Sequence, residues 1–157
     1  MEPQRCDILH VPASAELADN TANLLSRLPA WFGIPEATAE YVHSATELSG
    51  FRACIGQDVV GVLLYRRHYP ESTEIHLIAV DPGRHRRGIG RRLISALEEV
   101  QKEQGCRLLH VKTLGPSNPD PGYAGTRTFY RNMGFIPVEE THDLWIDNPC
   151  LIMVKVL

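Results

Sequence analysis

A basic turn with two glycines, His85-Arg86-Arg87-Gly88-Ile89-Gly90, is the stretch of this sequence best suited to binding a ligand. A helix beginning at Ile89 would present unpaired N–H groups and the positive end of its dipole to this turn. The glycines lack a Cβ, so a ligand can approach the backbone closely. Nearby arginines match phosphate geometry; they are Arg84, Arg86, Arg87, Arg91 and Arg92. The turn predicts an anion site, with a pyrophosphate as the natural guest, although a basic helix start with packing glycines explains the same residues.

Two other phosphate-binding loops do not fit this turn. A P-loop requires the pattern G-x-x-x-x-G-K-[ST], and no Lys-Ser or Lys-Thr pair follows Gly88 or Gly90. A dinucleotide fingerprint requires a third glycine, and Leu93 stands in its place. Neither of these nucleotide-binding classes is therefore predicted.

The elements on either side of the turn are a strand and a helix. The apolar, β-branched run Ile75 to Val80 predicts a strand, which Asp81-Pro82-Gly83 stops. From Ile89 the period becomes helical, with one apolar face and Gly105 placed to end the helix. The apolar run Arg107 to Thr113 then predicts a second strand, and such a strand–helix–strand unit makes the two strands parallel.

This strand, turn and helix resemble motif A of the GNAT superfamily of N-acetyltransferases. The family pattern is [Arg/Gln]-x-x-Gly-x-[Gly/Ala], and the run from His85 to Gly90 fits it, with His85 where the family prefers Arg or Gln. In the family this loop holds the pyrophosphate of acetyl-CoA, so the resemblance implies acetyl-CoA as cosubstrate. The cofactor-binding residues that it implies are Ile78, Ala79, Val80, His85, Arg86, Arg87, Gly88, Ile89, Gly90, Arg91 and Tyr130.

A second stretch, Phe129-Tyr130-Arg131-Asn132-Met133-Gly134-Phe135, resembles motif B of the same family, Tyr-x-x-x-Gly-Phe. The segments 28–36 and 112–117 also look like those of a bacterial subgroup whose acceptors are mostly unassigned. The resemblance covers nearly the whole chain. It implies an α/β (α+β) GNAT fold, in which helices flank a mixed, mostly antiparallel central sheet and the motif A strand splays from the next strand.

Acetyl transfer to an amine makes three chemical demands. The amine must lose a proton, because an ammonium has no lone pair and a lysine-like amine has a pKa of about 10.4. The tetrahedral oxyanion needs a hydrogen-bond donor, which a family bulge near Ile78 to Val80 implies is a backbone N–H there. The departing thiolate benefits from a proton donor, and the resemblance implies Tyr130 in that role. The alternative is a helix tyrosine that packs beside Phe129 and Met133.

Glu74 is the first candidate for the base, because Glu74 to Val80 also resembles the histone-acetyltransferase branch, whose base glutamate occupies this position. Alternation along a strand places Glu74 and His76 on the same face as Ile78 and Val80. His76 is the alternative base, since histidine titrates near neutral pH. Plainer interpretations are a solvated strand-end carboxylate for Glu74 and a half-buried strand residue for His76.

Other elements surround these motifs. A strand over 5–11 is followed by a helix that Ser14 caps and Pro29 ends or kinks. Trp31 and Phe32 come next, as pocket walls or, more commonly for aromatic residues, as core. The remaining predictions are a helix over 36–47, a hairpin of 51–55 with 59–68, an irregular loop over 114–125, a short helix over 126–133, and strands over 135–139 and 150–156.

Composition bounds the function classes. The 157 residues predict one domain over 1–157, and 43% hydrophobic with 22% charged residues is ordinary for a globular protein. A net charge of −3 argues against nucleic-acid and membrane partners, so the arginine cluster favours a small anion. Four dispersed cysteines without a C-x-x-C predict reduced thiols, a cytoplasmic protein and no metal site.

These observations predict an enzyme that transfers acetyl from acetyl-CoA to a primary amine of a small molecule or peptide, directly in a ternary complex. One alternative is acetylation of a protein N-terminus. Another is a non-catalytic acetyl-CoA-binding regulatory module, against which the presence of Glu74 and Tyr130 argues. Dimerisation is common in the family, so a homodimer is compatible with the resemblance.

Overall fold

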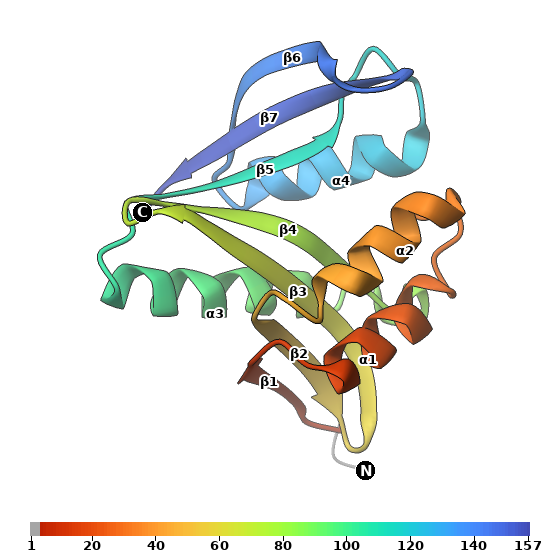
Figure 1. Ribbon diagram of the computed structural model, residues 1–157, viewed down its shortest axis with the longest axis vertical. Coiled ribbons are helices and arrows are strands. Elements are labelled where there is room, and N and C mark those ends of the chain that lie inside the picture. The colour runs from red at the N-terminus through yellow and green to blue at the C-terminus, as the bar shows by residue number, and fades with distance from the viewer. Residues whose placement is uncertain (1–3) are drawn as a thin grey trace. The chain divides into compact units, whose positions relative to one another are not determined.

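The computed structural model describes residues 4–157 of the chain (Figure 1). Within that range, seven strands follow the order β1-β2-β3-β4-β5-β7-β6 in a mixed, mostly antiparallel sheet flanked by helices, which confirms the expected fold class. The strands are β1 (Cys6–Val11), β2 (Gly50–Ile55), β3 (Asp58–Tyr69), β4 (Ser72–Val80), β5 (Leu108–Leu114), β6 (Ile136–Trp145) and β7 (Asn148–Val156). The helices are α1 (Ala15–Leu25), α2 (Pro35–Ser44), α3 (Ile89–Glu103), α4 (Pro121–Asn132) and the short 3-10 turn η1 (Pro82–Arg84).

Two compact units divide the chain. The first unit contains the residues up to Arg66 together with His76–Val100. The second unit contains Arg67–Ile75 together with Gln101–Leu157. Strand β4 therefore contributes its end to the first unit and its beginning to the second. The sequence predicted a single domain, and that expectation stays a prediction.

In the first unit, β1, β2 and β3 form an antiparallel ladder. The pairing of β1 with β2 runs from Cys6↔Ile55 to Val11↔Gly50. The β2–β3 hairpin closes on Ile55↔Asp58, so its turn has two residues and Asp58 already belongs to the strand. The hairpin is thus confirmed with a tighter turn than the sequence indicated.

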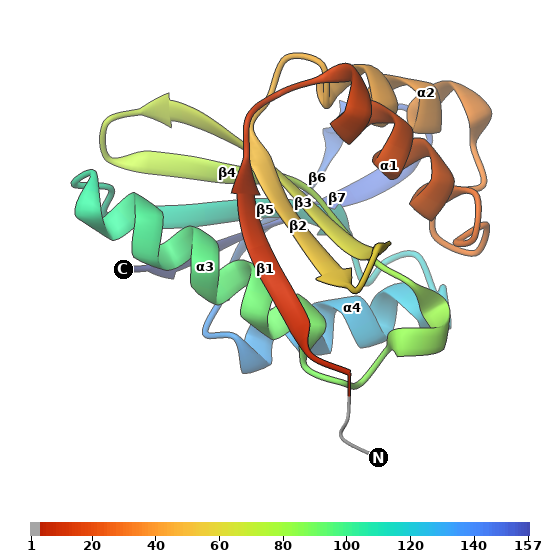
Figure 2. The same cartoon turned by 90° about the horizontal axis from the view of Figure 1, so that it is seen from below.

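Helices cover both faces of the first unit's strands, with α1 and α2 side by side on one face and α3 on the other (Figures 1 and 2). The α1 leucines form a buried cluster with residues of β3 and β4; its members include Leu17, Leu24, Leu25, Val62, Leu64, Leu77 and Ala79. On the α3 side, a Cβ at Gly61 would lie 3.2 Å from side-chain atoms of Ile89 and Leu93. Glycine at this position therefore lets α3 lie directly on β3.

Helix boundaries in the first unit follow local signals. The Ser14 hydroxyl oxygen accepts a hydrogen bond from the Leu17 N–H at 3.0 Å, so the predicted N-cap is confirmed. Helix α1 ends at Leu25, four residues before Pro29, so this proline neither ends nor kinks it. Helix α2 begins with Pro35, whose missing N–H costs nothing at a first helical position.

In the second unit, the beginning of β4 pairs with β5 in parallel, from Ser72↔Leu108 to Ile75↔Val111, as the sequence predicted. Strand β7 lies between β5 and β6 and is antiparallel to both. Helix α4 packs against β5. The buried side chains that follow or end this helix include Tyr130, Met133 and Phe135.

Two predictions in the second unit are wrong in extent. Helix α4 begins at Pro121 rather than near residue 126, because the Asp120 carboxylate accepts hydrogen bonds from the N–H groups of Gly122 and Tyr123, at 2.8 and 3.3 Å. The proline at the first helical position is well suited to that place. Strand β6 continues to Trp145 rather than ending near residue 139, because it forms a hairpin with β7 that closes on Trp145↔Asn148.

None of the helices within residues 4–157 combines the length and apolar character needed to cross a membrane.

Candidate functional site

The turn between β4 and α3 contains two residues with left-handed backbone. Arg86 has a φ of 63° and Gly88 a φ of 77°, both in the left-handed region. A non-glycine residue there costs on the order of 1–3 kcal/mol, which is a hint of function. Left-handed residues in a turn also bring successive N–H groups together into a concavity that suits anions. The strained Arg86 therefore marks this turn as the candidate binding site.

Open space and N–H groups without an intrahelical partner lie at the start of α3. A Cβ built on Gly88 would have no non-neighbouring atom within 4 Å, so the space beside this residue is open. The Arg92 N–H donates to the Gly88 carbonyl at 3.0 Å, and the N–H groups before it precede the first helical hydrogen bond. Helix α3 therefore points its unpaired donors and its positive dipole end at the turn.

The arginines of the turn divide into two roles. Arg86, Arg87 and Arg91 are exposed and can meet phosphate oxygens from solvent. Arg92 donates from Nη1 to the carbonyl of Cys6 at 2.7 Å and so ties α3 to β1. The predicted charge cluster is therefore partly structural.

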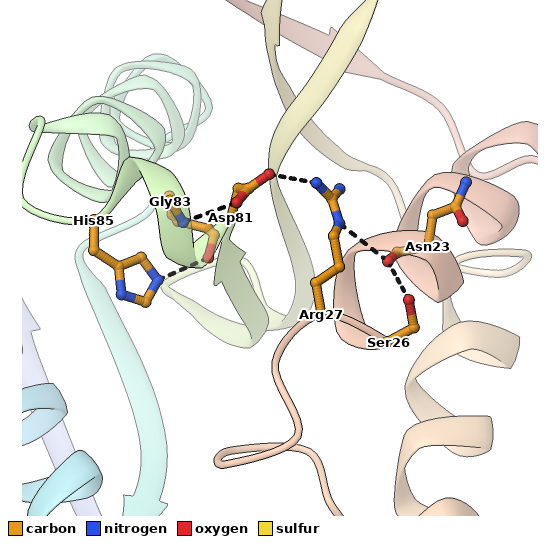
Figure 3. A network of polar contacts seen from close by, with 7 residues as sticks. Asn23, Ser26, Arg27, Asp81, Gly83 and His85 are labelled. Carbon is orange, nitrogen blue, oxygen red and sulfur yellow. Dashed lines mark hydrogen bonds and ion pairs between the residues drawn. The ribbon is translucent and has the colours of Figure 1, made fainter.

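His85, the residue that departs from the family pattern, fastens the turn to the end of β4. Its Nε2–H donates to the Val80 carbonyl at 2.8 Å (Figure 3). Its ring lies edge-on to Trp31, with ring centres 5.6 Å apart. These contacts give His85 a structural role, and a contact between His85 and the cofactor stays a prediction. Trp31 is half-buried, so it packs on the turn as well as on the core.

Asp81 is the first residue after β4 and begins the turn. One carboxylate oxygen accepts from the Gly83 N–H at 2.9 Å and the other from the guanidinium of Arg27 (Figure 3). The sequence offered no signal for this pair, because Arg27 lies 54 positions earlier in the chain. A polar cavity of about 360 Å³ opens beside the pair, and its lining includes Asn20, Asp58 and Arg84.

His76, one candidate base, lies in the first unit against the end of α2. Its Nε2 is hydrogen-bonded to the Ser44 hydroxyl at 3.1 Å, and its ring centre lies 5.5 Å from that of Tyr41. The side chain is half-buried, as the plainer interpretation also expected. Helix α2 therefore fixes the orientation of this imidazole.

Glu74, the other candidate base, lies in the second unit and is not a solvated carboxylate, so that interpretation is wrong. The residue is 7% exposed. One carboxylate oxygen accepts from His68 Nε2 at 2.8 Å, and the other lies 3.2 Å from Lys112 Nζ. Burial alone would raise the pKa of Glu74, but the hydrogen bond from His68 and the charge of Lys112 outweigh it and lower the pKa below its usual range.

Three neighbours of Glu74 were missed by the sequence reasoning. They are His68 from β3, and His110 and Lys112 from β5. Glu74 and His110 stand side by side in the β4–β5 register, and the rings of His110 and His68 lie 5.4 Å apart. Burial lowers the pKa of His110 despite the opposing effect of Glu74, which favours a neutral imidazole. Strand alternation in β5 could have paired His110 with Lys112, but their contact with Glu74 depends on the sheet register.

Tyr130, the candidate acid, lies in the second unit and is 4% exposed. Its ring centre lies 5.5 Å from those of Phe129 and Phe135. A packed ring was the plainer interpretation, and it is compatible with a reactive hydroxyl. The catalytic role therefore stays a prediction.

The sequence of this chain matches the model of a known protein family. A family model described as the acetyltransferase (GNAT) family matches residues 19–135, well over half of the chain. The chain belongs to this family. No curated protein matches the chain in sequence.

Solved structures of similar fold carry the names of acetyltransferases. A GNAT-family chain from Desulfovibrio desulfuricans has a TM-score of 0.83 at 20% identity, covering 97% of this chain and 99% of that one. The ribosomal-protein-S18-alanine N-acetyltransferase of Escherichia coli has a TM-score of 0.77 at 16% identity, covering 97% and 94%. An aminoglycoside 6'-N-acetyltransferase, complexed with coenzyme A, has a TM-score of 0.72 at 22% identity, covering 96% of each chain. At these identities the likeness shows the fold.

Proposed function

We propose that this protein transfers the acetyl group of acetyl-CoA directly to a primary amine of a small molecule or peptide. The observation that carries the proposal is the turn between β4 and α3, where Arg86 and Gly88 adopt left-handed backbone next to open space and a helix N-terminus. A pyrophosphate suits such a turn, because its oxygens can accept hydrogen bonds from several backbone N–H groups at once.

Acetyl-CoA fits the residues present in the turn. The N–H groups of residues 86–91 would hold the pyrophosphate, and the exposed Arg86, Arg87 and Arg91 would add charge. The end of β4, Ile78 to Val80, would supply further backbone contacts. When bound, acetyl-CoA supplies a thioester whose acyl carbon an amine can attack. The coenzyme A complex of the similar aminoglycoside acetyltransferase supports this choice of cosubstrate.

The proposed roles of the side chains follow from what an amine and a thiolate need. The incoming ammonium must give up a proton, and His76 or Glu74 would receive it directly or through water. The low pKa of Glu74 makes its carboxylate a weak proton acceptor and suits it better to attracting a cationic amine. The Tyr130 hydroxyl would give a proton to the departing sulfur.

The acceptor is proposed only as a class. One similar enzyme is named for an alanine of ribosomal protein S18, and another is named for an aminoglycoside. Both of these acceptors present an amine. They support a peptide and a small molecule equally. Acetylation of a protein N-terminus and a non-catalytic acetyl-CoA-binding role remain the alternatives, and the cytoplasm is the proposed compartment.

The test is release of coenzyme A from acetyl-CoA in the presence of a panel of primary amines and peptides, measured with a thiol reagent. We expect amine-dependent release, and we expect Tyr130→Phe to lower the turnover rate by about 100-fold, the low end of general acid–base effects. Affinity for acetyl-CoA should stay within about twofold, because only a hydroxyl is lost. A protein that binds acetyl-CoA but shows no amine-dependent release would be a regulatory module instead.

A further inference from the structure

We propose that Arg27 and Asp81 act together as positioning residues that hold the β4–α3 turn in its anion-binding conformation. We call this pair the Arg27–Asp81 tie. It joins the segment after α1 to the start of the turn, and it lies entirely within the first unit. The inference rests on the proposed function, because the affinity that the tie would raise is the affinity for acetyl-CoA.

Arg27 is well placed to act as a fixed anchor. It follows Ser26, the C-cap residue of α1, and its backbone N–H donates to the Leu24 carbonyl at 3.1 Å. The Asn23 carbonyl accepts from the Ser26 hydroxyl at 2.7 Å and, weakly, from Arg27 Nε at 3.5 Å (Figure 3). The Arg27 guanidinium therefore extends toward Asp81 from a segment that hydrogen bonds hold to the C-terminal end of α1.

Asp81 uses all its polar groups to shape the turn. Its N–H donates to the Val60 carbonyl at 2.8 Å, and its own carbonyl accepts from the Arg84 N–H at 2.8 Å. One carboxylate oxygen accepts from the Gly83 N–H at 2.9 Å, which forms an Asx-type turn. Arg27 holds the other oxygen and so fixes the rotation of the carboxylate on which that turn depends.

The tie matters because the turn further on is strained. Arg86 holds a left-handed conformation five residues beyond Asp81, and such conformations persist only when their surroundings enforce them. A turn that samples other conformations must be ordered by its ligand, which lowers the affinity in proportion to the fraction of time it is competent. Arg27 and Asp81 would keep that fraction high before acetyl-CoA arrives.

The effect on ligand binding is separable from an effect on folding. The side chains of Arg27 and Asp81 are 45% and 18% exposed and border the polar cavity, so solvent screens the pair. Such pairs contribute little to global stability. The chain also offers a matched control, because Arg52 and Glu16 join α1 to β2 by an arginine–carboxylate pair at 3.1 Å without touching the turn.

The experiment compares Arg27→Met, Asp81→Asn, the double variant that carries both changes, Arg27→Lys and the control Glu16→Gln by calorimetric titration with acetyl-CoA. Arg27→Met and Asp81→Asn should each weaken the binding of acetyl-CoA by about 3- to 10-fold. The double variant should bind no more weakly than the single variant with the lower affinity, because both changes break the same contact. Arg27→Lys and Glu16→Gln should bind nearly as tightly as wild type. The two losses of charge have opposite signs. If Arg27 and Asp81 acted on acetyl-CoA only through their charges, Asp81→Asn would bind this anion more tightly than wild type. That result would overturn the proposed role of the Arg27–Asp81 tie.

A second measurement does not depend on acetyl-CoA. Hydrogen exchange of the backbone amides of residues 82–88 in the ligand-free protein should speed up in Arg27→Met and Asp81→Asn but not in Glu16→Gln. Unchanged exchange in both variants would contradict the tie. If wild type does not bind acetyl-CoA, the proposed function fails, and the exchange measurement still decides whether the tie orders the turn.

Discussion

Glu74 illustrates at the scale of one residue how neighbours decide what a carboxylate can do. A glutamate at the end of a predicted strand is usually solvated, but here it is buried and both its oxygens have partners, His68 and Lys112. A carboxylate with these partners stays ionised well below neutral pH. A solvated glutamate at this position would be a better proton acceptor, whereas the buried and paired Glu74 is a fixed negative charge.

This arrangement predicts how stability depends on pH. The pKa of Glu74 is lower in the folded state than its ordinary value of 4.5, so its contribution is fully present above about pH 4.5 and is lost as the pH falls through the folded-state pKa. Glu74→Gln should lower the free energy of unfolding at pH 7 by about 1–3 kcal/mol, because it leaves Lys112 without its anion. Urea unfolding at pH 7 and pH 4 measures both effects.

The difference between wild type and Glu74→Gln should shrink from pH 7 to pH 4. Glu47, an exposed carboxylate on a different segment, provides the control, and Glu47→Gln should have little effect at either pH. A Glu74→Gln penalty that is equally large at pH 7 and at pH 4 would show that the ionised carboxylate is not the source of the stability.

At the scale of elements, helix α4 shows how a cap overrides composition. Residues 114–125 contain prolines and glycines at a density that predicts a loop, yet Pro121, Gly122 and Gly125 lie inside the helix. Proline is favoured at a first helical position, and the Asp120 carboxylate satisfies two N–H groups that would otherwise be unpaired. The signal was present in the sequence as Asp120-Pro121, a capping residue before a proline.

Removing this cap should shorten or loosen α4. Asp120→Ala should cost about 1 kcal/mol of stability, within the usual range of 0.5–2 kcal/mol for a lost N-cap, measured by urea unfolding at pH 7. Asp143→Ala, at an exposed position in β6, removes a carboxylate of the same size and should cost less than about 0.5 kcal/mol. Equal costs for the two variants would mean that the Asp120 bonds do not stabilise the helix start.

Local signals predicted most other elements. The Ser14 cap, the β2–β3 hairpin, and the β4, turn and α3 sequence carry their own periodicity and punctuation, and the structure confirms them. The placement of β7 between β5 and β6 and the length of β6 depend on pairing between distant strands. The contacts of Arg27 with Asp81 and of Glu74 with Lys112 likewise join residues far apart in sequence, which no spacing rule indicates.

At the scale of the whole molecule, membership of the GNAT family rests on residues 19–135, and each of the two units contains some of the candidate residues. The first unit holds the turn and His76, and the second holds Glu74 and Tyr130. Motif residues identified the turn, because a short backbone cradle needs only local sequence. Family resemblance suggested Glu74 and Tyr130, and strand alternation with the chemistry of histidine suggested His76. The surroundings of all three emerged only with the folded chain.

Binding of acetyl-CoA by the turn around Gly88 can be measured by calorimetric titration. Wild type should bind acetyl-CoA in the micromolar range and more tightly than ATP, while Gly88→Glu should lose at least about tenfold, or 1.4 kcal/mol. Gly105→Glu is the matched control, because Gly105 also has a positive φ, 84°, and open space for a Cβ, but follows the end of α3 instead of preceding its start. It should bind as wild type does. A well-folded wild type that does not bind acetyl-CoA, or a Gly88→Glu variant that binds as tightly as Gly105→Glu, would contradict binding of acetyl-CoA by this turn.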